Sequence, residues 1–210
     1  MKTNSVTSMA YLFNGCSSLK NINLEGFNYE QVTTIAYMFS NCSSLEEYDL
    51  NIPNAPLLTT ITYLFSGCSS LKNINLRNAD FKVATSMSYF FNGCSSLTRL
   101  DLSYLNIPKV TSYNYMFNNC SSLEELDLSC INISSNANIS YMFQNCLALK
   151  KLDIRNWSIN KVSSSNNYTG MFTNVPASCQ IIVKDEACRT WIKARKSTFT
   201  NIVLASELEG

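Results

Sequence analysis

Residues 115–128 read Tyr-Met-Phe-Asn-Asn-Cys-Ser-Ser-Leu-Glu-Glu-Leu-Asp-Leu, and this phrase occurs six times in the 210-residue chain with small changes. Its cysteine recurs at steps of 26 residues, as Cys16, Cys42, Cys68, Cys94, Cys120 and Cys146. A seventh, degraded copy begins at Met171 and Phe172, with Val175 in the cysteine's place. A fixed period of this size predicts one structural unit stacked on itself.

The length and composition limit the classes of protein to which the chain can belong. The repeat predicts one elongated domain, with a solenoid over residues 1–183 and a C-terminal cap over residues 184–210. The net charge is +1 and the Lys and Arg residues are dispersed, so no nucleic-acid footprint is expected. No apolar stretch reaches the roughly 18 residues of a membrane span. The N-terminus lacks the apolar core of a signal peptide and begins in mid-repeat, so we expect either a fragment or an open first coil.

Each unit reads as one coil of an α/β repeat solenoid. The spacing of Leu123, Leu126 and Leu128 alternates as in a short strand, and one strand per coil builds a parallel sheet. The segment around Tyr115 and Phe117 has spacings of three and four, which favour a short helical turn on the convex side. After residue 183 the chain predicts an amphipathic helix and a last strand, which would cap the stack.

Two aromatic columns run through the repeats. The tyrosine column is Tyr11, Tyr37, Tyr63, Tyr89, Tyr115 and Tyr141, and the phenylalanine column is Phe13, Phe39, Phe65, Phe91, Phe117, Phe143 and Phe172. No coil could offset its ordering entropy alone, so neighbouring coils must share these groups as a core. We interpret the columns as core rather than as a base-stacking platform, with the tyrosine hydroxyls at its outer edge.

The nine cysteines indicate buried thiols rather than a disulfide framework. Equivalent residues of a parallel stack lie about 4.8 Å apart, but their side chains point the same way, which is poor geometry for a bridge. Zinc is the alternative, yet the chain has no histidine and no Cys-x-x-Cys pair, so no metal site is predicted. Cys179 and Cys188 either pair across the cap or stay free. No cofactor is expected.

The candidate binding surface is the outward face of the sheet, where the repeats differ. Between the inward leucines, one position holds an aspartate or asparagine in every coil. Such a column predicts either a site for a cation or a basic partner, or a solvated surface relieved by nearby Arg and Lys residues. The candidate binding residues on this face are Asp49, Asn75, Arg99, Asp101, Glu125, Asp127, Lys151 and Asp153.

No catalytic set is evident in the sequence. Without histidine, a serine or cysteine nucleophile lacks its usual base, and no glycine-rich phosphate loop is present. A residue that the repeat copies six times is also a poor candidate for a unique catalytic role. We therefore expect a protein that is not an enzyme.

The unit from Thr85 to Ser103, Thr-Ser-Met-Ser-Tyr-Phe-Phe-Asn-Gly-Cys-Ser-Ser-Leu-Thr-Arg-Leu-Asp-Leu-Ser, resembles the BspA-like leucine-rich repeats. The resemblance covers almost the whole chain, from Val6 to about Leu204. It implies a right-handed leucine-rich-repeat stack, an extracellular or cell-surface location, and roles in adhesion or protein–protein contact.

Two functions remain after these observations. The first is a non-enzymatic binding module whose sheet face contacts an unknown protein or a host surface. The alternative is a structural spacer or assembly subunit of a cell-surface or virion array, which would self-associate through its open N-terminal coil. A binding module would depend on the charges of its sheet face for association. An assembly subunit would depend on its N-terminal end instead.

Overall fold

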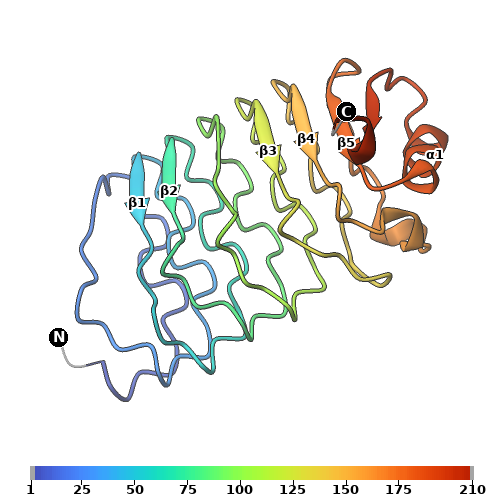
Figure 1. Ribbon diagram of the computed structural model, residues 1–210. Coiled ribbons are helices and arrows are strands. Elements are labelled where there is room, and N and C mark those ends of the chain that lie inside the picture. Colours follow the sequence, from blue (N-terminus) through green and yellow to red (C-terminus); the bar gives the residue numbers. More distant parts are fainter. Residues whose placement is uncertain (1–2, 209–210) are drawn as a thin grey trace.

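The protein is one row of stacked coils with a helix at its C-terminal end (Figure 1). A computed structural model describes residues 3–208, so the first two residues of the predicted solenoid and the last two of the predicted cap lie outside it. The N-terminus and α1 lie at opposite ends of the row, and the strands lie side by side along one edge. This is the solenoid that the 26-residue period predicts, and the fold class is confirmed.

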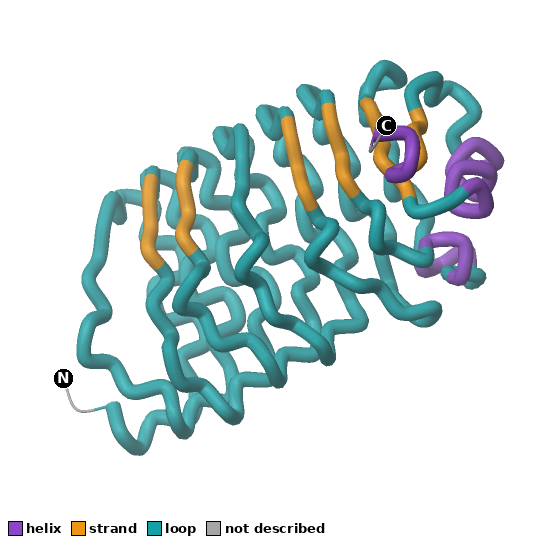
Figure 2. The backbone as a smooth tube through the Cα atoms, viewed as in Figure 1, coloured by secondary structure: helices purple, strands orange, loops and turns teal. Residues whose placement is uncertain are grey.

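The strands are short and parallel, and their register follows the repeat. The strands are β1 Glu47–Asp49, β2 Asn73–Asn75, β3 Glu125–Asp127, β4 Lys151–Asp153, β5 Gln180–Val183 and β6 Ile202–Leu204. Glu47 pairs with Asn73, and Glu125 with Lys151, which are steps of one repeat. The strands form two sheets, β1-β2 and β3-β4-β5-β6. Residues 99–101, in the coil between them, form no strand, so the expectation of a strand in every coil is only partly met (Figure 2).

The aromatic side of each coil is made of consecutive turns instead of the predicted helical turn. Every second N–H group donates to a carbonyl of its own coil. For example, Asn118 N donates to Tyr115 O at 3.2 Å. The alternate N–H groups donate to the next coil, as Phe117 N does to Met142 O at 3.0 Å. Tyr115 has a φ of 57°, which no right-handed helix contains. Spacings of three and four therefore arise here from turns linked across coils.

The tyrosine column adopts this left-handed conformation throughout. The φ values run from 54° at Tyr141 to 62° at Tyr11, an uncommon region for an aromatic residue. The rings stack, with centroids 4.2 Å apart for Tyr63 and Tyr89 and 4.6 Å apart for Tyr11 and Tyr37. These rings are half-buried except Tyr11, which is exposed, so the column lies at the outer edge of the core as expected.

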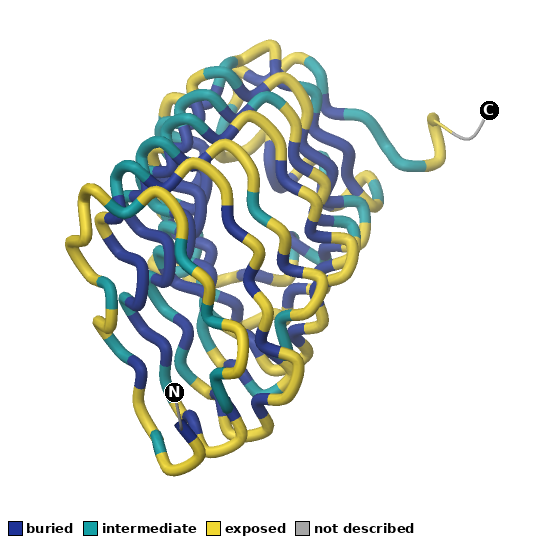
Figure 3. Tube along the Cα trace, turned by 90° about the vertical axis from the view of Figure 1, so that its left-hand side faces the viewer, coloured by how far each residue is buried: buried dark blue, intermediate teal, exposed yellow. Residues whose placement is uncertain are grey.

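The core fills the inside of the row, where buried segments of successive coils lie in line (Figure 3). Phe39, Phe65, Phe91, Phe117 and Phe143 have no exposed surface. Beside them lie the buried thiols of the 26-residue cysteine column. Each of these donates a hydrogen bond to a phenylalanine carbonyl of the preceding coil, as Cys94 Sγ does to Phe65 O at 3.2 Å. All nine cysteines are free, so Cys179 and Cys188 do not pair. Cys16 belongs to the same column but is exposed in the first coil.

The last coils carry short 3-10 helices, and the C-terminal end is closed by the cap. The 3-10 helices are η1 Ile159–Lys161, η2 Ser165–Asn167 and η3 Ala205–Leu208. Helix α1, Glu186–Arg195, begins after Asp185, whose Oδ1 accepts the Cys188 N–H at 2.9 Å. It buries Cys188, Trp191 and Ile192 against the end of the stack, and β6 then extends the sheet beyond β5. The predicted helix–strand cap is thus present.

Substitutions at Gly93 test whether the turn before each cysteine needs a left-handed residue. The φ of Gly93 is +76°, and Asn119 and Asn145 hold the same place in later coils at 60° and 61°. We expect Gly93→Asn to be tolerated and Gly93→Val to lower the free energy of unfolding by about 1–2 kcal/mol more, because a branched side chain resists the left-handed conformation. Urea unfolding of both variants measures the difference. Equal costs would contradict this account of the turn.

Candidate functional site

The outer face of the strands carries a groove of about 810 Å³ that crosses the stack from β1 to β4. Its floor is formed by Tyr48, Ile74, Leu100 and Leu126. Each is the middle residue of the three-residue strand position in its coil. The side chains on either side of each central residue point outwards because direction alternates along a strand. The alternation of side-chain direction within each coil therefore forms the groove, and the stacking of successive coils lengthens it.

All eight predicted binding residues line this groove. They are Asp49, Asn75, Arg99, Asp101, Glu125, Asp127, Lys151 and Asp153. Two further polar residues, Glu47 and Asn73, line it as well and were not among the predicted residues. They occupy the same repeat position as Arg99 and Glu125, so the period itself was the signal that could have identified them. The geometry brings the candidate residues together without assigning them a ligand.

The aspartate or asparagine column has a structural task. Asp127 Oδ1 accepts the Ser129 N–H at 2.8 Å, and Asn75 Oδ1 accepts the Arg77 N–H at 3.1 Å. Asn23, Asp101 and Asp153 make the same bond two residues on. Such bonds form the turn that follows this position in all these coils, which explains why only these two residue types occur there. Asp49 makes no such bond within residues 3–208, and at Asp127 the second carboxylate oxygen is the one that a ligand could use.

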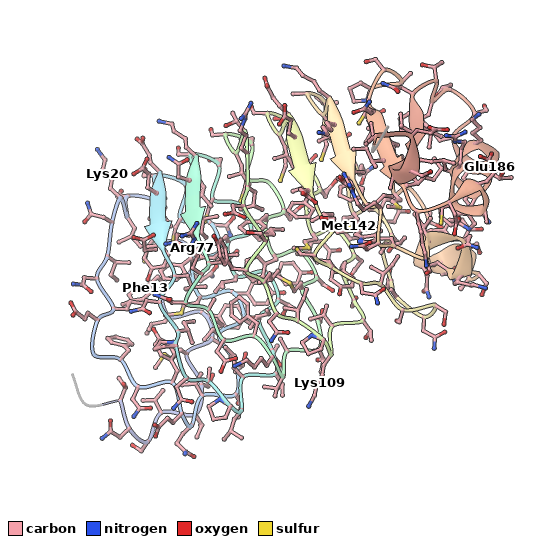
Figure 4. The ribbon with its side chains drawn as sticks, in the orientation of Figure 1. Phe13, Lys20, Arg77, Lys109, Met142 and Glu186 are labelled. Carbon is pink, nitrogen blue, oxygen red and sulfur yellow. The ribbon has the colours of Figure 1, made fainter. Side chains whose placement is uncertain are left out.

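Neighbouring basic residues compensate part of the acidic lining. Arg77 lies beside β2 in Figure 4, and its Nη2 is 3.8 Å from Asp101 Oδ2. Arg99 Nη2 lies 3.8 Å from Glu125 Oε1. Hydrogen bonds from the Ser103 hydroxyl and N–H lower the pKa of Asp101. Within residues 3–208, Glu47, Asp49 and Asp127 form no ion pair, so these three carboxylates are the least compensated of the groove.

Asp153 corrects one expectation. The strand pattern predicts an outward, solvated carboxylate, but Asp153 is only 4% exposed. Arg155 Nε lies 3.0 Å from its Oδ1 and 2.9 Å from its Oδ2, and β5 packs beside its strand. Asp153 therefore lines the end of the groove as half of an internal ion pair and offers little to a partner.

One further column links neighbouring coils by charge through two ion pairs. Lys72 Nζ lies 2.7 Å from Glu46 Oε2, and Lys150 Nζ lies 3.0 Å from Glu124 Oε2. Both pairs join the same repeat position in successive coils, as the alternation of charge along the sequence indicates. They are exposed, and exposed pairs contribute roughly 0–1 kcal/mol each, so they support register more than stability.

The buried thiols are poorly suited to nucleophilic chemistry. Burial raises the pKa of Cys68 and of Cys146 to about 12, and it raises the pKa of Cys94 and Cys120 well above the ordinary value. A nucleophilic or metal-binding cysteine needs its thiolate form. Among the described residues, no group of three or more potential ligands could hold a metal ion.

The groove lies on a domain without a transmembrane helix in its described part. No helix in residues 3–208 combines the length and the apolar character that crossing a bilayer requires. The longest helix, α1, has only 10 residues.

Comparison with known proteins identifies the repeat. Residues 2–113 match the family model described as the BspA type leucine rich repeat region, and residues 59–184 match the model described as Mycoplasma protein of unknown function, DUF285. The crystal structure of the pneumococcal vaccine antigen PcpA is similar in fold, with a TM-score of 0.52 and 19% identity. The match covers 83% of this chain and 40% of that chain. No curated protein sequence gave a match. The chain therefore belongs to the BspA-type leucine-rich-repeat proteins.

Proposed function

We propose that this protein is a non-enzymatic binding module that engages another protein through the sheet-face groove. One observation carries the proposal: the groove runs across five coils and combines an apolar floor with a polar lining that differs from coil to coil. The aromatic and thiol columns, by contrast, repeat because each coil needs the same core. Variation on one continuous surface is what specific recognition requires.

The lining favours a basic partner. Six carboxylates border the groove, from Glu47, Asp49, Asp101, Glu125, Asp127 and Asp153, against the basic groups of Arg99 and Lys151. Three of the six already have arginine partners, Asp101 with Arg77, Glu125 with Arg99 and Asp153 with Arg155. The other three, Glu47, Asp49 and Asp127, form no ion pair within residues 3–208 and attract an extended segment rich in lysine or arginine. The half-buried Ile74 offers such a segment some apolar surface on the floor of the groove.

We infer the location from the family. BspA-type repeats and the vaccine antigen of similar fold favour a cell-surface or extracellular protein. Adhesion to a host protein is the role that fits both the groove and that location. The absence of histidine from the sequence and the raised thiol pKa values support a role without catalysis.

Charge reversal tests the groove directly. The probe is a synthetic ten-residue peptide of alternating lysine and leucine, measured by isothermal titration at low salt. We expect Asp127→Lys to weaken binding by about tenfold or more, because a like charge replaces an attractive one in the lining of the groove. Added salt should weaken wild-type binding, since exposed charges are screened.

The matched control is Glu30→Lys, which makes the same charge change at an exposed residue outside the groove lining. It should bind the peptide as the wild type does. If both variants lose affinity equally, only net charge matters and the groove is not the site. If neither loses affinity, the proposal of a basic partner fails.

A second candidate is an assembly subunit, in which the first described coil packs against a second copy of the protein. Tyr11 is 57% exposed and Leu12 is 47% exposed on the face that a further coil would cover. The carbonyls of Ala10, Leu12 and Asn14 accept no hydrogen bond within the described chain, whereas their equivalents in the second coil do. Sedimentation over a range of concentrations distinguishes the candidates. Self-association that Asp127→Lys leaves unchanged and Tyr11→Asp abolishes would support assembly.

A further inference from the structure

A second cavity lies at the opposite end of the stack from the first coil, between the last turn segment and the cap. It has a volume of about 400 Å³ and is separate from the sheet-face groove. Residues 168–173 form one wall, and Trp191, Arg195 and Lys196 from the end of α1 form the other. It occupies the place where the turn segment of an eighth coil would lie.

The coil-to-coil hydrogen bonds stop at this cavity. In the preceding coil, Tyr141 N donates to Thr169 O at 2.8 Å, Phe143 N to Met171 O at 3.1 Å, and Asn145 N to Thr173 O at 2.9 Å. The equivalent N–H groups of the last coil belong to Gly170, Phe172 and Asn174. None of these three has a hydrogen-bond acceptor among residues 3–208. By the same register they point away from the stack, towards the cap.

Gly170 breaks the tyrosine column at this point. It has the φ of 64° that the tyrosines share, but the Tyr141 ring occupies the space that a Cβ would need. Because Gly170 has no side chain, its N–H group is not shielded by a side chain of the same residue. The column thus ends in an open hydrogen-bonding edge beside a cavity.

The cavity wall adds positive charge and aromatic surface. The Arg195 guanidinium lies 4.0 Å from the Trp191 ring centroid and 4.6 Å from that of Tyr168, and its Nη1 donates to Trp191 O at 3.1 Å. This stacking holds the cation in place. Lys196 adds a second positive charge, and no acidic residue is among the described residues of the lining. Met171 and Phe172 supply apolar surface.

We propose that this end cavity binds a carboxylate carried on an apolar group. The open N–H edge requires acceptor oxygens, which the carbonyls of the next coil supply everywhere else in the stack. Arg195 and Lys196 favour acceptors with negative charge, since charge-assisted bonds are the stronger ones. The aromatic wall accommodates the ligand's apolar body. A peptide's C-terminal residue and an acidic side chain beside an apolar residue both have this chemistry.

Amide chemical shifts of the whole chain, labelled with ¹⁵N, test the site. The probes are N-acetylphenylalanine, its α-amide, N-acetylglutamic acid α-amide and inorganic phosphate. We expect the carboxylate probes to shift the amide signals of Gly170 and Phe172, and the phenylalanine amide to leave them in place. Tighter binding of N-acetylphenylalanine identifies a C-terminal residue as the source, and tighter binding of the glutamic derivative identifies a side chain.

Variants separate the site from the fold. Arg195→Gln and Lys196→Gln should each weaken binding of the carboxylate by roughly tenfold, in line with the loss of one charge-assisted hydrogen bond. Lys196→Gln leaves the arginine–tryptophan stack intact, so it remains informative if Arg195→Gln loosens the cap. Lys193→Gln, on α1 but outside the cavity lining, is the control and should bind normally. Equal shifts with the uncharged amide, or stronger shifts with phosphate, would overturn the proposal.

Discussion

The protein is expected to lose about 8 kcal/mol of stability by about pH 10, because six buried thiols resist ionisation in the folded state. Burial raises the pKa of Cys42 to about 11 and that of Cys179 to about 12. Burial raises the pKa of Cys68 and Cys146 from 9.0 to about 12. The pKa of Cys94 and of Cys120 is raised well above 9.0. In the unfolded chain these thiols ionise near pH 9, so high pH favours unfolding.

The sign and the size follow from the folded pKa values. A group whose pKa is raised on folding contributes its stability below the unfolded value and loses it as the pH rises towards the folded value. Each thiol therefore costs roughly 1.4 kcal/mol for each pH unit above about 9. Since a domain of ordinary stability has only about 5–15 kcal/mol, the effect is large. Urea unfolding in reductant at steps from about pH 8 to about pH 10 measures it. Because tyrosines of the unfolded chain begin to ionise near about pH 10, variants that remove single thiols separate the thiol contribution from theirs.

Two valine variants serve as controls. Cys94→Val should reduce the pH slope by about a sixth, the share of one thiol in six. The chain itself indicates that valine fits, because Val175 takes this position in the last coil and is buried. Cys16→Val, at the exposed end of the same column, should leave the slope unchanged. A free energy of unfolding that stays flat up to about pH 10 would contradict the buried thiol column.

The second large effect is expected from Phe91→Ala, which should lower the free energy of unfolding by about 3–5 kcal/mol. Phe91 has no exposed surface and lies between Phe65 and Phe117, with ring centroids 6.0 Å and 5.9 Å away. It also meets the Phe90 ring edge-on at 4.7 Å. Removing the ring leaves a cavity that three rigid neighbours cannot fill.

The matched control is Phe13→Ala, the same substitution at the same repeat position. Phe13 is half-buried in the first coil, and Phe39 is its stacking partner, at 5.5 Å. Its loss should cost less than half as much, since less apolar surface is uncovered. Chemical denaturation of both variants provides the comparison. Equal losses would show that the ring column is not a shared core.

Much of the fold is predictable from the sequence because the period fixes the register. A step of 26 residues pairs Glu47 with Asn73, and it also aligns Phe91 with Phe117. The same spacing identifies the cysteines as a core column. Local spacing was less decisive at the tyrosines, because intervals of three and four suit a helix and a series of turns alike. Hydrogen bonds between coils, which no local pattern contains, select the turns.

The sequence also predicts which residues face the candidate site, but not how each of them is covered. The alternation of the strand predicts which side chains face outwards, and all eight candidates reach the groove. The sequence could not indicate that Asp153 is covered, because that burial depends on Arg155 and on β5 from the cap side. Nor did it indicate the end cavity, which depends on where α1 places Trp191 beside residues 168–173.

Amide hydrogen exchange of the protein bound to the lysine–leucine peptide tests the central claim, that recognition lies on the sheet face and the aromatic columns are scaffold. The account predicts slower exchange in residues 73–75, 99–101 and 125–127, which line the groove. Exchange in the turn segments around Tyr89 and Tyr115 should not change. Protection of those turns, with the groove residues unaffected, would contradict it.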